Sequence, residues 1–151
     1  MKIAVQTAPF DLNAEVTALH HANPAVGAVA SFLGTVRGES GQVSEMALEH
    51  YPGMTEKALT TIVQEAQTRW AITDATVIHR IGPLAPCEPI VLVAVASAHR
   101  GDAFAACEFI MDFLKTRAPF WKKETTAEGG QWVDARDSDE TATQRWGNQG
   151  H

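Results

Sequence analysis

The sequence has 151 residues, 45% of them hydrophobic and 20% charged, with a formal net charge of −6 at pH 7. These values are ordinary for a soluble globular domain that is long enough to bury a hydrophobic core. The longest apolar run, at 90–98, is too short to cross a membrane and predicts a buried strand. The two cysteines, Cys87 and Cys107, form no CxxC pair, and the N-terminal residues lack the apolar stretch of a signal peptide. We therefore expect a protein of the reducing cytoplasm.

The N-terminal residues predict a strand followed by a short helix. Residues 2–7 alternate loosely between apolar and polar, as a strand does. Asp11 stands at the N-cap of a helix at 12–22. His20 and His21 end this helix, where a positive charge is favourable, so we interpret them as capping residues and not as metal ligands.

The next segment predicts two strands and a longer helix. Residues 27–37 are rich in strand-forming residues, and Gly34 inside them indicates a bulge or a close approach of another backbone. Residues 37–44 are polar and predict a mobile loop, after which 45–51 predict a second strand. Apolar residues recur at helical spacing over 55–70, which predicts a helix that packs on the core.

The second half of the chain predicts a strand, a loop, a central strand and a second long helix. Residues 75–82 read as a strand, and 83–89 as a loop with several prolines. The apolar run at 90–98 predicts a central strand, because strands buried on both faces are apolar throughout. Asp102 stands where an N-cap belongs, and Pro119 should end the helix that follows it.

The last segment predicts a hairpin and a polar tail. Residues 120–135 contain two short strands with Gly129 and Gly130 as turn residues. Strands and helices do not alternate strictly, which favours an α+β fold over a doubly wound sheet. We expect a single α+β domain at 1–136, with a mixed or antiparallel sheet and packed helices, and a polar tail at 137–151.

Cations cluster in the segment 114–123, which contains no carboxylate although the whole chain is acidic. This local reversal of charge predicts a pocket for a small anion and argues against a nucleic-acid groove. A lysine near other cations, or partly desolvated, has a lowered pKa and can act as acid, base or nucleophile. Lys115 and Lys122 flank the turn at Pro119, which can direct both to one cavity. A solvated basic face is an equally weighted interpretation of the same residues.

His99 and Arg100 emerge where the central strand meets the N-terminus of a helix, and the free N–H groups there favour anions. Arg37 also lies at a strand end, and guanidinium groups provide forked donors for phosphate. No spacing typical of a zinc site groups the histidines, and no phosphate-binding glycine loop is present, so we expect no metal and no cofactor. Cys87 and Cys107 lie in a proline-rich loop and among apolar neighbours, so we interpret both as passive.

Several long segments together resemble the large, catalytic subunit of molybdopterin synthase. They are GAVASFLGTVRG, LEHYPGMTEKAL, VIHRIGPL, ASAHRGDAFAACEFIMDFLKTRAPFWKKE and QWVDAR, in that order between residues 27 and 136. The resemblance implies an α/β-hammerhead fold. It also implies a sulfurtransferase that adds two sulfur atoms to cyclic pyranopterin monophosphate and so forms the dithiolene of molybdopterin.

The same resemblance implies the partners. The sulfur arrives as a thiocarboxylate on the C-terminal glycine of a small ubiquitin-like sulfur-carrier subunit, whose tail enters the pocket of the large subunit. Two large subunits form a homodimer within a heterotetramer that has one small subunit at each end. No nucleic acid, membrane or cofactor takes part.

Carried over by position, the resemblance implies that Lys115 and Lys122 are catalytic. Lys115 would act as an acid/base or covalent group, and Lys122 would stabilise negative charge. The residues implied to bind substrate or line the pocket are Phe32, Thr35, Val36, Arg37, His99, Arg100, Met111, Lys123, Glu124 and Arg136. Arg136 would reach the site of the neighbouring subunit. Thr35 departs from the pattern, because some relatives carry lysine there.

Two other classes of function fit parts of the sequence. A non-catalytic scaffold or carrier for a pterin or nucleotide phosphate would need the same cations, and would lose binding and turnover together when Lys115 is replaced. A pure interaction module for a ubiquitin-like protein would present an exposed apolar groove without convergent cations, and the cations of 115–123 argue against it.

Overall fold

The computed structural model describes the backbone of residues 1–38, 45–126 and 129–133 and the side chains of 1–38 and 47–120. The elements in chain order are β1 (Lys2–Gln6), α1 (Leu12–His20), β2 (Ala28–Thr35), β3 (Glu45–His50), α2 (Met54–Arg69), β4 (Ile72–Arg80), β5 (Gly82–Leu84), β6 (Pro89–Ser97), α3 (Arg100–Thr116), β7 (Phe120–Thr126) and β8 (Gly129–Val133). Within this part of the chain, no helix is long and apolar enough to cross a membrane.

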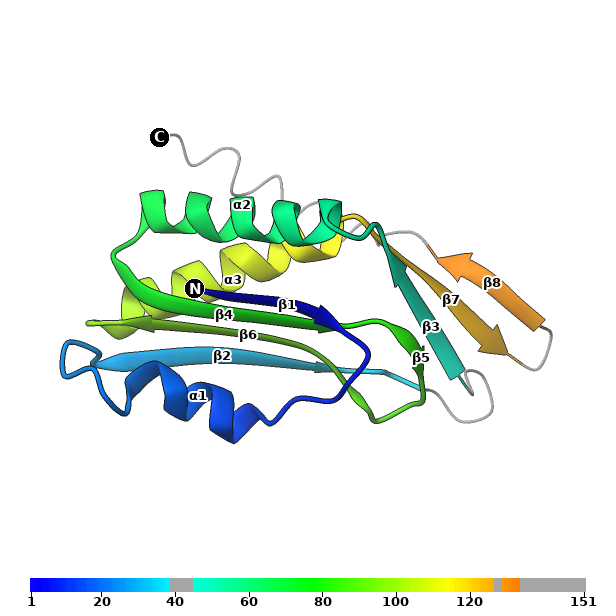
Figure 1. The fold of residues 1–151 in the computed structure, drawn as a ribbon, viewed down its shortest axis with the longest axis horizontal. Coiled ribbons are helices and arrows are strands. Elements are labelled where there is room, and N and C mark those ends of the chain that lie inside the picture. Colours follow the sequence, from blue (N-terminus) through cyan, green and yellow to red (C-terminus); the bar gives the residue numbers. More distant parts are fainter. Residues whose placement is uncertain (39–44, 127–128, 134–151) are drawn as a thin grey trace.

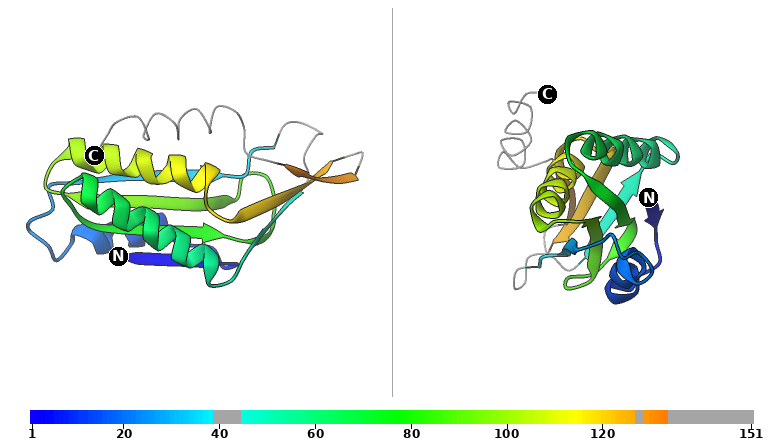
Figure 2. Two further views of the ribbon diagram at one scale, coloured as in Figure 1. Left: turned by 90° about the horizontal axis from the view of Figure 1, so that it is seen from above. Right: turned by 90° about the vertical axis from the view of Figure 1, so that its left-hand side faces the viewer.

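The larger sheet has the strand order β1-β4-β6-β2 (Figure 1). β1 runs parallel to β4, whereas β6 pairs antiparallel with both β4 and β2. Every residue of β6 from Ile90 to Ser97 is buried, which confirms the predicted central strand. The reason is that helices cover both faces of the sheet (Figure 2).

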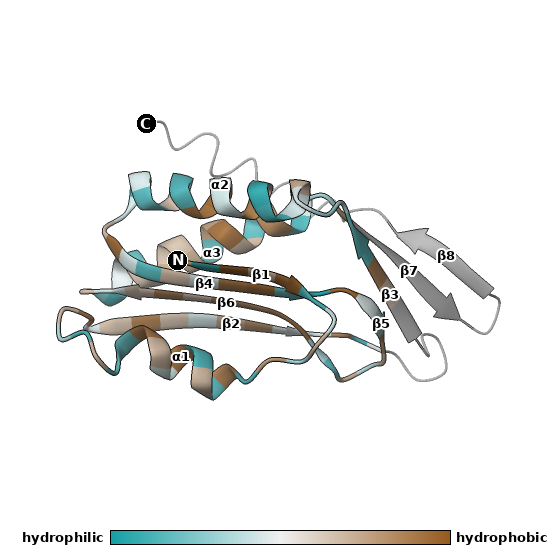
Figure 3. Ribbon diagram, in the orientation of Figure 1, coloured by the Kyte–Doolittle hydropathy of each residue, from teal (hydrophilic) through white to brown (hydrophobic). Residues whose placement is uncertain are grey.

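Helices α2 and α3 lie side by side on one face of this sheet, and α1 lies on the other (Figures 1 and 2). The stripe predicted for α2 is buried, with Leu59, Val63 and Ala66 almost inaccessible. In α3 the ring of Phe109 is fully buried and packs edge-on against Trp70, with 5.3 Å between ring centroids. Figure 3 shows the same arrangement as apolar strands beneath helices that are polar on their outer faces.

A smaller sheet with the order β5-β3-β7-β8 projects obliquely from the end of the molecule where α3 ends (Figure 1). β3 pairs antiparallel with β5 and β7, and β7 pairs antiparallel with β8. A layered body with a second sheet set across one end confirms the predicted α+β class and the hammerhead type. The prediction of a mixed or antiparallel sheet is also confirmed.

The first turn of α3 differs from the prediction. The helix begins at Arg100 with His99 as its N-cap, so the N-cap predicted at Asp102 is wrong. The Ser97 hydroxyl accepts the backbone N–H of His99 at 3.3 Å and donates to Ala71 O at 2.7 Å, and the chain turns into the helix directly after the strand. The Asp102 carboxylate instead accepts the backbone N–H of Ala71 at 3.3 Å and joins α3 to the start of β4. At the other end, α3 stops at Thr116, shortly before Pro119, as predicted.

The hairpin also differs from the prediction in its turn. Gly129 and Gly130 belong to β8, where they pair with Thr126 and Thr125, so they are not the turn residues. The connection is therefore only two residues long, a length that antiparallel strands accommodate readily. In the predicted loop 83–89, residues of β5 pair with β3, an interaction between distant segments that local sequence does not signal. Residues 39–44 of the loop predicted at 37–44 and the tail at 137–151 lie outside the described residues.

Candidate active site

Lys115 lies exposed in the last turn of α3, close to the junction with the smaller sheet. The helix ends as the backbone N–H of Arg117 donates to Phe113 O at 2.7 Å. The buried hydroxyl of Thr55, at the start of α2, donates to Pro119 O at 2.9 Å and fixes the turn that follows. β7 begins at the next residue. The local fold thus directs the chain from Lys115 straight into the strand that carries the second candidate lysine.

Lys122, Lys123 and Glu124 are placed by the backbone of β7. Lys122 lies opposite Leu48, and Lys123 and Glu124 follow along the same ladder to β3. Their side chains lie beyond Phe120, outside the described residues. Arg136 lies outside the described residues.

Arg37 follows two residues after the end of β2, and β2 ends at the same end of the molecule as α3 (Figure 1). Thr35 is the last residue of β2 and pairs with Pro89 across a register shift after Gly34. The bulge predicted at Gly34 is confirmed, and a Cβ atom there would lie 2.6 Å from Val91 Cγ1. Val36 is buried in the core, whereas Arg37 is exposed. A buried valine thus anchors the backbone directly before a guanidinium at the surface.

His99 and Arg100 lie at the opposite end of α3 from Lys115. The helix rises about 1.5 Å per residue, so Arg100 and Lys115 are separated by about 22 Å along its axis. Both His99 and Arg100 are exposed. Within one chain, these two residues and Lys115 are therefore too far apart to contact one small molecule.

Phe32 and Met111 lie between the two ends. Phe32 is on the edge strand β2, opposite Val93, and 40% exposed. Met111 is only 7% exposed and belongs to the main hydrophobic core. Of the two, Phe32 is the side chain that presents an apolar surface to solvent.

His79, to which the sequence analysis assigned no role, is buried at the end of β4 and is close enough to Lys115 for the lysine charge to lower its pKa. Its ring stacks on Phe120, with 4.0 Å between centroids, and its Nδ1 lies 2.8 Å from Arg80 O. Burial is the main cause that lowers the pKa of His79 from 6.5 to about 4. The backbone hydrogen bond opposes this shift, whereas the positive charges of Lys115 and His50 add to it. The buried imidazole of His79 is therefore neutral at neutral pH.

The buried His79 should make the stability of the protein depend on pH. The unfolded chain takes up this proton near pH 6.5 and the folded chain only near pH 4, so stability falls as pH decreases between these values. A shift of this size amounts to roughly 3 kcal/mol of unfolding free energy lost between about pH 7 and about pH 4. His79→Phe keeps a ring against Phe120 but removes the titration. Urea unfolding across this pH range should give a flatter profile for the variant, and coinciding profiles would contradict the assignment.

The cysteines offer little nucleophilic chemistry. Cys107 is buried in α3, with Sγ 3.6 Å from Val93 O. Burial, and to a lesser extent Glu108, raise the pKa of its thiol to about 11, so it is protonated at neutral pH. Cys87 is exposed, in a turn with φ of +77°. Among the described residues, no three His, Cys, Asp or Glu side chains are grouped so that they could hold a metal ion.

A separate groove of about 540 Å³ runs between α2 and α3. Its apolar lining includes Met54, Ile62 and Phe109, with Lys57 and Arg117 as cations. None of the residues predicted to bind substrate or to act in catalysis lines it. The candidate active site therefore lies apart from this groove, around Lys115 in the last turn of α3 near the junction with the smaller sheet.

The chain is similar to known proteins over most of its length. The family model described as MoaE protein matches residues 5–117. The molybdopterin synthase catalytic subunit of Ralstonia nicotianae is 65% identical over 147 residues, which cover 96% of this chain and 84% of the relative. The corresponding protein of Escherichia coli is 54% identical, with 96% and 97% covered.

Solved structures agree with these sequence matches. The molybdopterin biosynthesis MoaE protein from Burkholderia ambifaria has a TM-score of 0.84 at 58% identity, covering 98% of this chain and 99% of that one. Molybdopterin synthase from Staphylococcus aureus has a TM-score of 0.80 at 34% identity, with 88% and 98% covered. Sequence, fold and chain length all match, and the chain belongs to the MoaE family.

Proposed function

We propose that this chain is the catalytic subunit of a molybdopterin synthase. It converts cyclic pyranopterin monophosphate into molybdopterin with sulfur from the thiocarboxylated C-terminal glycine of a small ubiquitin-like subunit. The observation that carries this proposal is the 65% identity, over nearly the whole chain, to a protein named molybdopterin synthase catalytic subunit. The exposed Lys115 and Arg37 at one end of the molecule provide the cations that a phosphate-bearing substrate requires.

Lys115 and Lys122 have different roles in this proposal. Lys115 acts as an acid/base or covalent group, since a primary amine, unlike a guanidinium, can give up a proton or attack an electrophile. Lys122 stabilises the negative charge that develops as the thiocarboxylate reacts. Arg37 holds the substrate phosphate beside them, and the preceding residues Thr35 and Val36 belong to the same part of the substrate site. Lys123 and Glu124 belong to the same strand and complete the substrate site.

His99 and Arg100 serve the site of a second copy of the chain. Their separation of about 22 Å from Lys115 along α3 supports this arrangement, because one small substrate cannot reach both ends of the helix. The exposed Phe32 lines the pocket with Met111, and Arg136 extends to the neighbouring subunit. The assembly is thus a homodimer of this chain within a heterotetramer that includes two small subunits.

The sulfur does not pass through a cysteine of this chain. Cys107 is buried and protonated, and the partner's thiocarboxylate already supplies the sulfur. We place the reaction in the cytoplasm, where free cysteines such as Cys87 and Cys107 persist. Residues 1–136 form the catalytic domain, and 137–151 form a polar tail.

The direct test is to incubate the purified chain with cyclic pyranopterin monophosphate and the thiocarboxylated partner. Mass spectrometry should show a product with two added sulfur atoms and a partner whose thiocarboxylate has become a carboxylate. The matched control is the same partner with an ordinary C-terminal carboxylate, which should give no product. Binding of the precursor without any product would favour the scaffold or carrier instead.

A further inference from the structure

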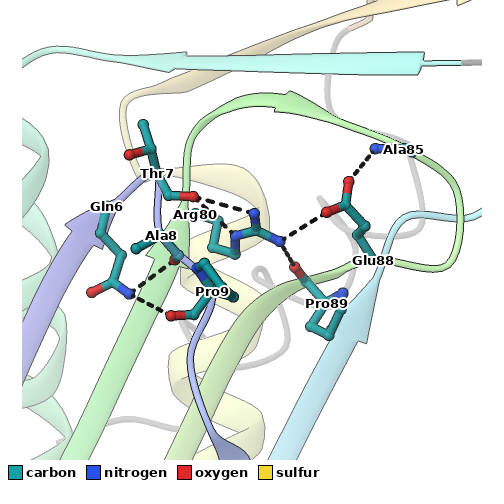
Figure 4. Close-up of polar contacts among 8 residues, drawn as sticks. All are labelled: Gln6, Thr7, Ala8, Pro9, Arg80, Ala85, Glu88 and Pro89. Atoms are coloured by element: carbon teal, nitrogen blue, oxygen red, sulfur yellow. Dashed lines mark hydrogen bonds and ion pairs between the residues drawn. The ribbon is translucent and has the colours of Figure 1, made fainter.

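Arg80, the last residue of β4, carries a guanidinium group that is almost completely buried (Figure 4). Its Nε and Nη2 donate to Thr7 O at 3.3 and 3.2 Å, and its Nη1 donates to Pro89 O at 3.0 Å. Nη1 also lies 3.6 Å from Glu88 Oε1. The group thus joins the segment after β1 to the first residue of β6, and no candidate catalytic residue is among these contacts.

The turn that Arg80 contacts also holds the end of β2. The Glu88 carboxylate accepts the backbone N–H of Ala85, which closes the turn (Figure 4). The backbone N–H of Val36 donates to Glu88 O, and Val36 O accepts the N–H of Cys87, both at 2.9 Å. Both backbone polar groups of Val36 are therefore bonded to this turn. Arg37 is the next residue, so its position depends on where the turn is held.

We propose that Arg80 is a positioning residue that sets the place of Arg37 through the 85–89 turn. This inference rests on the proposed function, in which Arg37 holds the phosphate of the substrate. Arg80 itself touches no substrate. Its contacts with Thr7 O anchor it to the segment after β1, and its hydrogen bond to Pro89 O and its ion pair with Glu88 hold the turn. The two hydrogen bonds of Val36 transmit that position to Arg37.

The side chain of Arg80 is better suited to holding the turn in place than to stabilising the fold. A guanidinium presents its donors in a rigid, planar fork, which holds acceptors on two separate segments at fixed angles. A buried ion pair adds little net stability, because desolvation of the charges offsets their attraction. Lysine in its place would supply one compact charge on a flexible stem and would not fix both carbonyl groups.

The test is steady-state kinetics of the assembled enzyme with varied precursor, comparing wild type with Arg80→Met. Loss of a well-placed phosphate ligand weakens ground state and transition state alike, so we expect KM to rise about tenfold and kcat to stay within about twofold. The effect should disappear in an Arg37→Ala background, where Arg80→Met should change KM by less than about twofold. A purely structural role would instead give additive effects in this cycle.

Two further variants make the result decisive. Arg69→Met is the matched control, because the Arg69 side chain is 10% exposed, against 8% for Arg80, and pairs with Glu65 at 3.2 Å. It should leave the KM for precursor unchanged. If Arg80→Met does not fold, Glu88→Ala replaces it, and the same coupling to Arg37→Ala is expected. Additive KM effects would overturn the positioning role, whereas an inactive wild type would overturn the proposed function.

Discussion

Lys115→Arg is expected to fold and to bind both partner and precursor, yet to form product about 10²- to 10⁴-fold more slowly than the wild type. Arginine keeps the positive charge but does not give up a proton in the accessible pH range. Lys115 is exposed at the end of a rigid helix, so the longer side chain fits without disturbing the core. Single-turnover product formation measures the chemical step, and calorimetry with each ligand measures binding.

Two comparisons separate chemistry from charge at this position. Lys57→Arg changes another exposed lysine, in the groove between α2 and α3, and should leave the rate unchanged. Lys122→Arg should be milder than Lys115→Arg, because a role in charge stabilisation survives the exchange in part. The pH dependence of stability should also survive in Lys115→Arg, since the charge beside His79 is retained. Near-normal turnover by Lys115→Arg would show that Lys115 contributes only its charge, and would contradict the acid/base or covalent role.

Local sequence signals predicted most of the elements correctly. Asp11 caps α1 as expected and accepts the backbone N–H of Ala14 at 3.2 Å. β6 and α2 could be predicted from the pattern of apolar residues alone. A strand buried on both faces is apolar throughout, and a helix buried on one face has apolar residues at helical spacing. Asp102 misled because an acidic residue in the first turn of a helix resembles an N-cap, and its actual partner, Ala71, is distant in sequence.

Contacts between distant segments account for what the sequence did not predict. β5 exists because Met46, Ala47 and Leu48 pair with it, and Gly129 and Gly130 lie in a strand because Thr125 and Thr126 extend opposite them. The buried position of His79 depends on the stacking with Phe120, which joins the end of β4 to the start of β7. No spacing within the chain encodes that contact.

The candidate site, too, was predicted in part from local sequence and depends in part on the fold. Charge alone singled out the segment around Lys115, and the fold brings the end of β2, which Arg37 follows, to the same end of the molecule as the end of α3 (Figure 1). The resemblance grouped His99 and Arg100 with them as substrate-binding residues, but helix α3, which separates His99 and Arg100 from Lys115, is 17 residues long. The helix predicted between Asp102 and Pro119 already implied this separation through its rise of about 1.5 Å per residue, whereas the resemblance names site residues without saying which subunit supplies each.

This distance leads to a complementation experiment with the dimer. Lys115→Ala and Arg100→Ala should each be inactive as pure homodimers, because every shared site then lacks one of the two groups. In a hybrid dimer, one site draws Lys115 from one chain and Arg100 from the other, and both are intact, while the second site lacks both. Random mixing makes half of the dimers hybrid, so about a quarter of the wild-type activity should return.

The control for this experiment is a mixture of Lys115→Ala and Lys122→Ala. Both lysines lie at the same end of the chain, on α3 and on the strand that follows it, so each site takes both from a single subunit. Every site in the hybrid then lacks one lysine, and no activity should return.

Hybrids are isolated with two affinity tags, so that their formation is established before the assay. Isolated Lys115→Ala/Arg100→Ala hybrids that remain inactive would show that His99 and Arg100 do not complete the site of the neighbouring subunit. Activity in the hybrids of both mixtures would place the two lysines in different subunits and would require a different division of the site.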